Sequence, residues 1–201
     1  QSVFGKNSDL PTTISDFSQG HRVIANVAYE HKWTKNIKTT LSLFYDGAES
    51  APFSYIYQEG RDLFNDDSRD NALIYIPRDA SEITFLEGAN GLTAAEQWAA
   101  LDAFIEGNDY LRSRRGKFAE RNGDQGPWSD IVDLKLIQDF SIDAFGKNHT
   151  LQFTADIFNF TNMLNKDWGR RKYVSTNVGL IRTEQAGANP VFSFNHDAFA
   201  N

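Results

Sequence analysis

The side chains in this sequence that are best suited to chemistry are carboxylates gathered in one short run, 59–71. Four of them are Asp62, Asp66, Asp67 and Asp70, and the run also contains amide side chains such as Asn65. Closely spaced carboxylate and amide oxygens in a flexible loop are the ligands that Ca²⁺ prefers, which makes these aspartates the candidate metal ligands and calcium the candidate cofactor. The DxDxDG order of a calcium loop and its turn glycine are missing, however. A solvated polar loop is therefore favoured over a calcium site.

The remaining reactive side chains form no catalytic arrangement. The sequence has no cysteine, and it contains neither a GxSxG nucleophile elbow nor a GxxxxGK[ST] phosphate loop. No pair of carboxylates stands out as an acid and base couple. The histidines lack the close spacing of a zinc site and are expected at strand ends or on the surface: His21, His31, His149 and His196. The sequence therefore does not predict an enzyme.

A small basic cluster comprises Arg112, Arg114, Arg115 and Lys117. Opposite charges in one chain tend to pair, so we expect this cluster to lie against the acidic run. A phosphate or anion site is the less favoured interpretation.

Composition limits the class of protein further. The 201 residues are 40% hydrophobic and 23% charged, which indicates a folded chain. A net charge of −7 argues against a nucleic-acid partner, whose binding surface would be basic. Aromatic residues make up 13% of the chain although its mean hydropathy is −0.50, a combination typical of strands with one apolar and one wet face. No run of 18 apolar residues is present, so no transmembrane helix is expected.

Alternating apolar and polar residues predict two β-hairpins and a fifth strand. The first hairpin joins 21–31 to 37–46, and the second joins 130–144 to 149–159 through a turn signal at 145–148. The fifth strand is expected over 172–183. The apolar positions on one face of these strands are Val23, Ala25, Val27, Tyr29, Ile37, Leu41, Leu43, Tyr45, Val132, Leu134, Leu136, Phe140, Ile142, Leu151, Phe153, Ala155 and Ile157.

A long connection, 47–129, separates the two hairpins. Thr93 and Glu96 have the spacing of a capping box, which predicts a helix near 93–106. Short turns therefore alternate with long connections, as in outer-membrane barrels, where one rim has tight turns and the other long loops. The expected fold class is all-β: antiparallel up-and-down strands of a transmembrane β-barrel, with 47–129 as a long extracellular loop that carries the helix. Five strands are too few to close a barrel, so the chain is expected to be part of a larger one.

Several motifs occur in the order found in one family of membrane proteins. They are R-V…Y at 22–29, LFY at 43–45, LIYIPRD at 73–79, AERNG at 119–123 before PW at 127–128, and DIFNFTNMLNKDWG at 156–169. From about His21 to about Ile181 the chain resembles the C-terminal barrel portion of Oar-like TonB-dependent outer-membrane receptors of Bacteroidota. Members often have Asn-Asp where this chain has Asn71-Ala72, and a glycine where it has Asp67. These departures weaken a calcium site inferred by analogy.

The resemblance implies an outer-membrane location and TonB-driven import of a ligand. The implied partners are the lipid bilayer, the rest of the receptor barrel and its plug, and the TonB complex through a missing N-terminal part. A surface lipoprotein is a further candidate partner. On this interpretation residues 1–201 are the C-terminal part of the barrel.

Two other functions remain open. A soluble secreted β-rich domain could bind carbohydrate or peptide on a platform of Trp98, Trp128, Tyr55 and Tyr57. A surface adhesion or structural barrel would share the barrel fold and lack TonB coupling.

Overall fold

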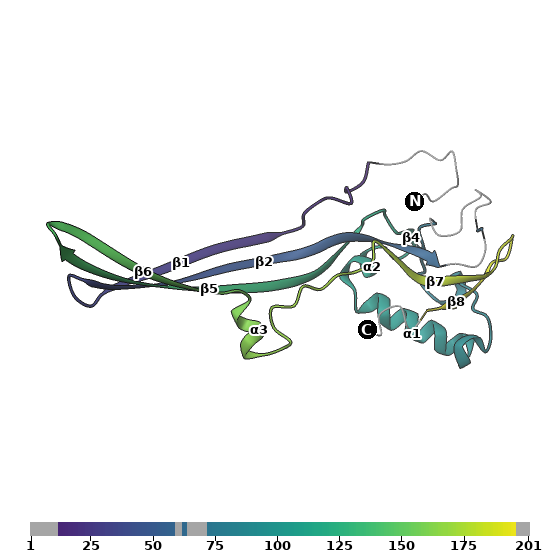
Figure 1. The fold of residues 1–201 in the computed structure, drawn as a ribbon. Coiled ribbons are helices and arrows are strands. Elements are labelled where there is room, and N and C mark those ends of the chain that lie inside the picture. Colours follow the sequence, from purple (N-terminus) through teal and green to yellow (C-terminus); the bar gives the residue numbers. More distant parts are fainter. Residues whose placement is uncertain (1–11, 59–61, 64–71, 196–201) are drawn as a thin grey trace. The chain divides into compact units, whose positions relative to one another are not determined.

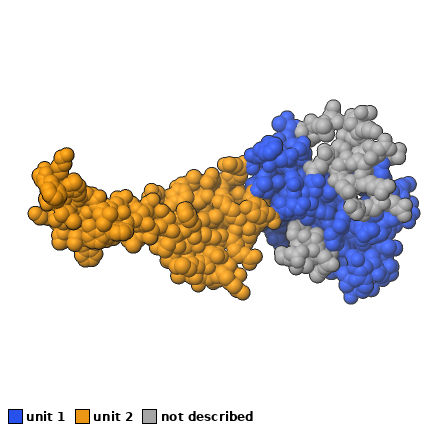
Figure 2. Space-filling view, viewed as in Figure 1, with its two compact units in different colours: residues 1–18, 51–125, 174–201 blue, residues 19–50, 126–173 orange. Residues whose placement is uncertain are grey.

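The computed structural model describes residues 12–58, 62–63 and 72–195. The fold is mostly β, and the chain divides into two compact units (Figure 2). The sheet unit comprises 19–50 and 126–173, and the core unit comprises 1–18, 51–125 and 174–201.

The sheet unit contains four neighbouring strands in the order β1-β2-β5-β6 (Figure 1). Their full bounds are Arg22–Lys32 for β1, Ile37–Gln58 for β2, Asp124–Ala144 for β5 and Lys147–Ile157 for β6. The two predicted hairpins are confirmed: β1 pairs antiparallel with β2, and β5 pairs antiparallel with β6. The turn between β5 and β6 contains Phe145 and Gly146, both at positive φ (53° and 70°), a geometry that matches the twist of the paired strands.

The two hairpins are joined because β2 pairs with β5. The Thr39 hydroxyl donates to the Gln138 carboxamide oxygen at 2.5 Å. Nearer the other end of the sheet, the Tyr45 hydroxyl donates to Asp130 at 2.5 Å. Residue numbers therefore rise along β2 as they fall along β5, which makes this pair antiparallel as well.

The core unit has a different strand arrangement. The end of β2 pairs in parallel with β7 (Asn177–Gln185), and β7 pairs antiparallel with β8 (Val191–Phe194). The sheet is therefore mixed, and the expectation of purely antiparallel strands is wrong at the β2–β7 pair.

Helices and short strands complete the core unit. The structure has the helix expected near 93–106 as α1 (Ala94–Glu106), with the Thr93–Glu96 capping box formed. The other elements are β3 (Tyr75–Ile76), η1 (Ala80–Glu82), η2 (Ala89–Gly91), α2 (Asp109–Ser113) and β4 (Lys117–Phe118). The side chains of Leu101, Ile105 and Leu111 are 0% exposed, and burying each contributes about 1.5–3 kcal/mol.

The segment 47–129 is more ordered than a loop. β2 continues to Gln58, β5 begins at Asp124, and α1 lies between them. The strand extension lacks an alternating pattern because every residue of 52–57 is buried, so neither of its faces meets water. β8 and the short helix α3 (Phe160–Leu164) were not predicted, and the fifth strand begins at Asn177 rather than at 172. Among the described residues, no helix combines the length and apolarity needed to cross a membrane.

Candidate functional site

The strongest functional feature is the difference between the two faces of the sheet unit. Because side chains alternate along a strand, the register decides which residues share a face. Val27 lies opposite Leu43 on the first hairpin, and Phe140 lies opposite Leu151 on the second. The contact between Thr39 and Gln138 places both sets on the same side. This apolar face comprises Val23, Val27, Tyr29, Leu41, Leu43, Val132, Leu134, Leu136, Phe140, Ile142, Leu151, Phe153 and Ile157.

The apolar face is exposed. Val27 is 67% exposed, Leu151 59% and Phe153 58%, whereas the core of the other unit has side chains at 0%. On β5 the alternate positions from Val132 to Ile142 include no Asp, Glu, Lys or Arg. A large exposed apolar surface of this kind marks an interaction surface.

Aromatic residues with polar tips lie at both ends of the apolar face. Near the β1–β2 turn, the rings of His31 and Trp33 pack edge to face at 4.4 Å, and the Trp33 indole donates to the Thr39 hydroxyl at 2.9 Å. At the other end, the Trp128 indole donates to Asp130 at 2.8 Å, beside the Tyr45 hydroxyl. The rings of Trp33, Tyr45 and Trp128 therefore each have an apolar body on the face and a polar tip in a hydrogen bond.

The opposite, polar face has a network that crosses all four strands. The Lys38 ammonium lies 3.2 Å from both the Glu30 and the Asp139 carboxylates. Asp139 also accepts from the Gln152 carboxamide at 2.7 Å. Lys135 pairs with Asp156 at 3.2 Å farther along the second hairpin. The charges that the sequence places between apolar residues are thus gathered and paired on one side of the sheet.

A three-membered charge cluster lies at the end of this polar face. The Asp46 carboxylate accepts from Arg22 at 2.8 Å and from Arg171 at 3.3 Å, and its side chain is nearly buried. Sequence reasoning missed this cluster, because Arg171 is distant in the chain and has no pattern linking it to Asp46.

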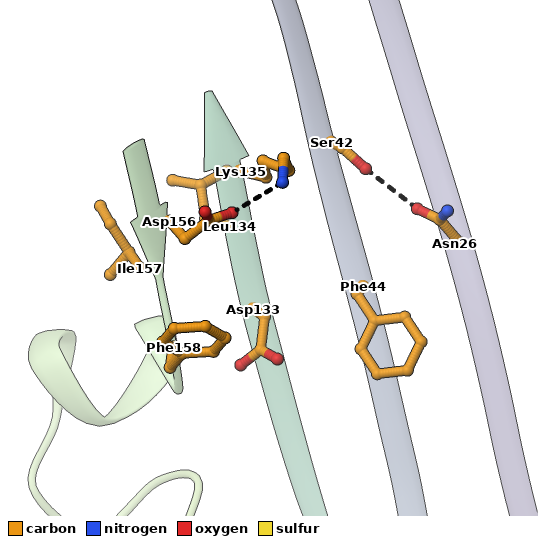
Figure 3. A pocket seen from close by; sticks show the side chains of 9 residues that line it. All are labelled: Asn26, Ser42, Phe44, Asp133, Leu134, Lys135, Asp156, Ile157 and Phe158. Carbon is orange, nitrogen blue, oxygen red and sulfur yellow. Dashed lines mark hydrogen bonds and ion pairs between the residues drawn. The ribbon is translucent and has the colours of Figure 1, made fainter. Parts of the chain in front are cut away.

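A hollow of about 250 Å³ lies on the polar face (Figure 3). The side chains of Phe44, Asp133 and Phe158 lie next to one another across β2, β5 and the end of β6. The Ser42 hydroxyl donates to Asn26 at 3.0 Å at the far side of the hollow. The hollow offers aromatic rings for stacking and amide, hydroxyl and carboxylate groups for hydrogen bonds to a solute.

Most of the candidate metal ligands lie outside the described part of the chain. Asp62 lies within the described residues, but Asp66, Asp67 and Asp70 lie outside them. Among the residues that the structure places, no group of three His, Cys, Asp or Glu side chains could hold a metal ion.

Most of the acidic run lies outside the described residues; within the described part of the chain, the basic cluster pairs with carboxylates on α1 and after α2. The Arg115 guanidinium lies 2.5 Å from the Asp102 carboxylate and 2.7 Å from that of Glu106, both on α1. Arg114 pairs with Glu120 at 2.8 Å. Arg115 thus holds the segment after α2 against α1, and Arg114 pairs within that segment.

The proposed aromatic platform does not form an exposed surface. Tyr55 and Tyr57 are 1% and 6% exposed and belong to the core. The Tyr55 hydroxyl donates to the Asp124 carboxylate at 2.9 Å. Burial, together with that carboxylate, raises the pKa of Tyr55 well above its ordinary value, and burial raises the pKa of Tyr57 to about 12. Neither ring is available to stack on a ligand, so these two tyrosines are structural.

Comparison with known proteins adds no relative: no family model, curated protein or solved structure matches the chain.

Proposed function

We propose that the sheet unit is part of the wall of an outer-membrane β-barrel, and that the chain acts in TonB-dependent import of a ligand. The apolar face would contact lipid, and the polar face would line the lumen. The observation that carries this proposal is the register, which gathers most of the exposed apolar residues of four strands on one side and the paired charges on the other. Ile24 and Phe44 are the exposed apolar residues of β1 and β2 that lie on the polar face.

The dimensions of the apolar face support this placement. Val132 and Ile142 are ten residues apart on β5, which is about 33 Å along a strand. A strand tilted by about 40° would span a height of about 25 Å, the height of the apolar band of outer-membrane barrels. The aromatic residues at both ends of the face are placed as such barrels place their aromatic girdles.

The sheet unit also needs further strands. β1 and β6 lie at the two edges of its four strands, and a bilayer does not tolerate unpaired backbone groups at an edge. A barrel would remove both edges by pairing them with strands outside this unit. A platform on Tyr55 and Tyr57 for a sugar or peptide finds no support, because both rings are buried.

The membrane placement is tested by an arginine on each face of β6. Phe153→Arg adds a charge to the apolar face, and its neighbour Thr154→Arg adds the same charge to the polar face. In the complete polypeptide that carries this sequence, we expect Phe153→Arg to destabilise the inserted state by about 2–4 kcal/mol and to abolish membrane assembly. Thr154→Arg is expected to assemble. Heat-modifiable electrophoretic mobility of the detergent-extracted membrane fraction measures assembly; equal assembly of the two variants would reject the proposal.

TonB coupling rests on the resemblance and needs its own test. A strain without this protein and a strain without TonB are compared over one panel of nutrients. A shared uptake defect that the wild-type gene restores in the first strain supports import. Normal uptake in both strains would favour an adhesion or structural barrel.

A further inference from the structure

A second hollow, of about 340 Å³, lies beside the apolar face. One wall is formed by the start of β5 and the other by residues 158–173, which we call the α3 loop. The residues that matter for its chemistry are Trp128, Asp130 and Val132 of β5 and Trp168, Arg170 and Lys172 of the loop.

The position of the hollow follows from the strand pattern. Trp128, Asp130 and Val132 are alternate residues of β5, and they share the side on which Leu134 and Leu136 stand. The hollow therefore opens at the border between the apolar face and its aromatic end. On the proposed membrane placement, this border is the level of the lipid headgroups.

Asparagine side chains hold the α3 loop in shape. The Asn159 carboxamide donates to the Gly169 carbonyl at 3.0 Å, and the Asn162 carboxamide donates to the Trp168 carbonyl at 2.9 Å. The Lys172 backbone N–H donates to the Ser129 hydroxyl at 3.1 Å, which fixes the loop against β5. These hydrogen bonds hold the backbone that carries Arg170 and Lys172 in a fixed conformation.

The α3 loop combines apolar and basic residues. Met163, Leu164 and Trp168 are exposed. The stretch 166–172 has four cations and one carboxylate, in a chain whose net charge is −7. Exposed apolar side chains next to cations are typical of segments that lie in a membrane interface and attract anionic headgroups.

Both carboxylates of the hollow already have partners. Asp130 accepts from the Tyr45 hydroxyl and the Trp128 indole. Asp167 faces Arg170 at 3.6 Å, and both side chains of this pair are largely exposed. An exposed ion pair at this distance is weak. A phosphate can therefore replace the Asp167 carboxylate as the partner of the Arg170 guanidinium.

We propose that this hollow binds the phosphate-bearing headgroup of a membrane lipid. Arg170 and Lys172 contact the phosphate, Trp128 and Trp168 flank it, and the acyl chains lie along the apolar face from Val132 onward. This site rests on the proposed membrane function.

The test uses the complete polypeptide in a zwitterionic detergent and measures lipid binding by native mass spectrometry. The probes are dioleoylphosphatidic acid and dioleoylglycerol, which have the same acyl chains and differ in the phosphate. The pocket variant is Arg170→Gln with Lys172→Gln. The control, Lys35→Gln with Lys147→Gln, removes the same charge from exposed lysines at the two hairpin turns.

We expect the wild type to prefer phosphatidic acid over dioleoylglycerol, and the pocket variant to bind it about tenfold more weakly. The control variant should bind like the wild type, and inorganic phosphate should not displace the lipid. Equal binding by all variants, an equal loss in both double variants, or displacement by inorganic phosphate would each overturn the site. If the protein still needs detergent, such a result rejects the headgroup site alone; a folded protein that needs no detergent rejects the membrane function too.

Discussion

At the scale of single residues, Gly169 decides the shape of the α3 loop. Its φ is 64°, and a Cβ at this position would collide with the Asn159 carboxamide oxygen. That oxygen is buried without a hydrogen-bond partner among the described atoms. A single added methyl group would therefore displace the Asn159 side chain and break its hydrogen bond to the Gly169 carbonyl.

We predict that Gly169→Ala destabilises the protein more than Gly146→Ala. Gly146 also has a positive φ, 70°, but a Cβ there meets nothing within 4 Å. Both variants incur about 1–2 kcal/mol from the left-handed backbone, and Gly169→Ala adds the collision with Asn159. Detergent-solubilised thermal unfolding measures the difference. Equal melting temperatures for the two variants would show that the loop is not held by this contact.

At the scale of elements, helix α1 illustrates what local sequence can specify. The Thr93 hydroxyl accepts from the Glu96 backbone N–H at 3.2 Å, and the Thr93 backbone N–H donates to the Glu96 carboxylate at 2.8 Å. These hydrogen bonds involve residues three positions apart, so the spacing alone predicts them. Gln97, next to them, is fully buried and ties the helix to the Leu86 carbonyl and the Phe194 N–H. No sequence pattern indicates that role.

The capping box predicts a pH dependence of stability. The hydrogen bond from the Thr93 backbone N–H holds the pKa of Glu96 below its ordinary value of 4.5. A depressed pKa in the folded state adds stability above pH 4.5, and that stability is lost as the pH falls through the lower folded value. The melting temperature of Glu96→Gln should therefore lie below that of the wild type at pH 6, and the gap should narrow below pH 4.5. A gap that stays constant from pH 6 to pH 3.5 would contradict this prediction.

At the scale of the whole molecule, the two units bury apolar residues in different ways. The core unit packs Leu101, Ile105 and Leu180 away from solvent within its own structure. The sheet unit leaves Val27 and Phe153 exposed on its apolar face. On the proposed function, lipid covers this face, so the two units are stabilised by different surroundings.

Single-tryptophan variants test this difference. The chain has four tryptophans, and three at a time are changed to Phe. In bilayers of brominated phosphatidylcholine, we expect the fluorescence of Trp33 and Trp128 to be quenched, because each lies at an end of the apolar face. Trp98 packs against the core cluster and should keep its intensity. Similar quenching at all three positions would contradict the proposed division between lipid-facing and core residues.

The sequence by itself determined the features that depend on neighbours in the chain. The alternation of apolar and polar residues places Leu151 and Gln152 on opposite faces of β6. The turn at 145–146 allows β6 to pair with β5. Thr93 and Glu96 specify the start of α1 in the same local way. Periods of 2 and 3.6 residues, turns and caps are all set by interactions over a few residues.

The tertiary structure alone decided how these elements combine. The contact between Thr39 and Gln138 joins residues 99 positions apart, and it places the apolar sides of both hairpins on one face. The parallel pairing of Ser54 with Asn177 and the burial of Tyr55 likewise depend on distant partners. A local pattern shows that a strand has an apolar side. Only long-range pairing shows which other strands place their apolar sides on the same face of the sheet, because strand pairing depends on the packing of the whole chain.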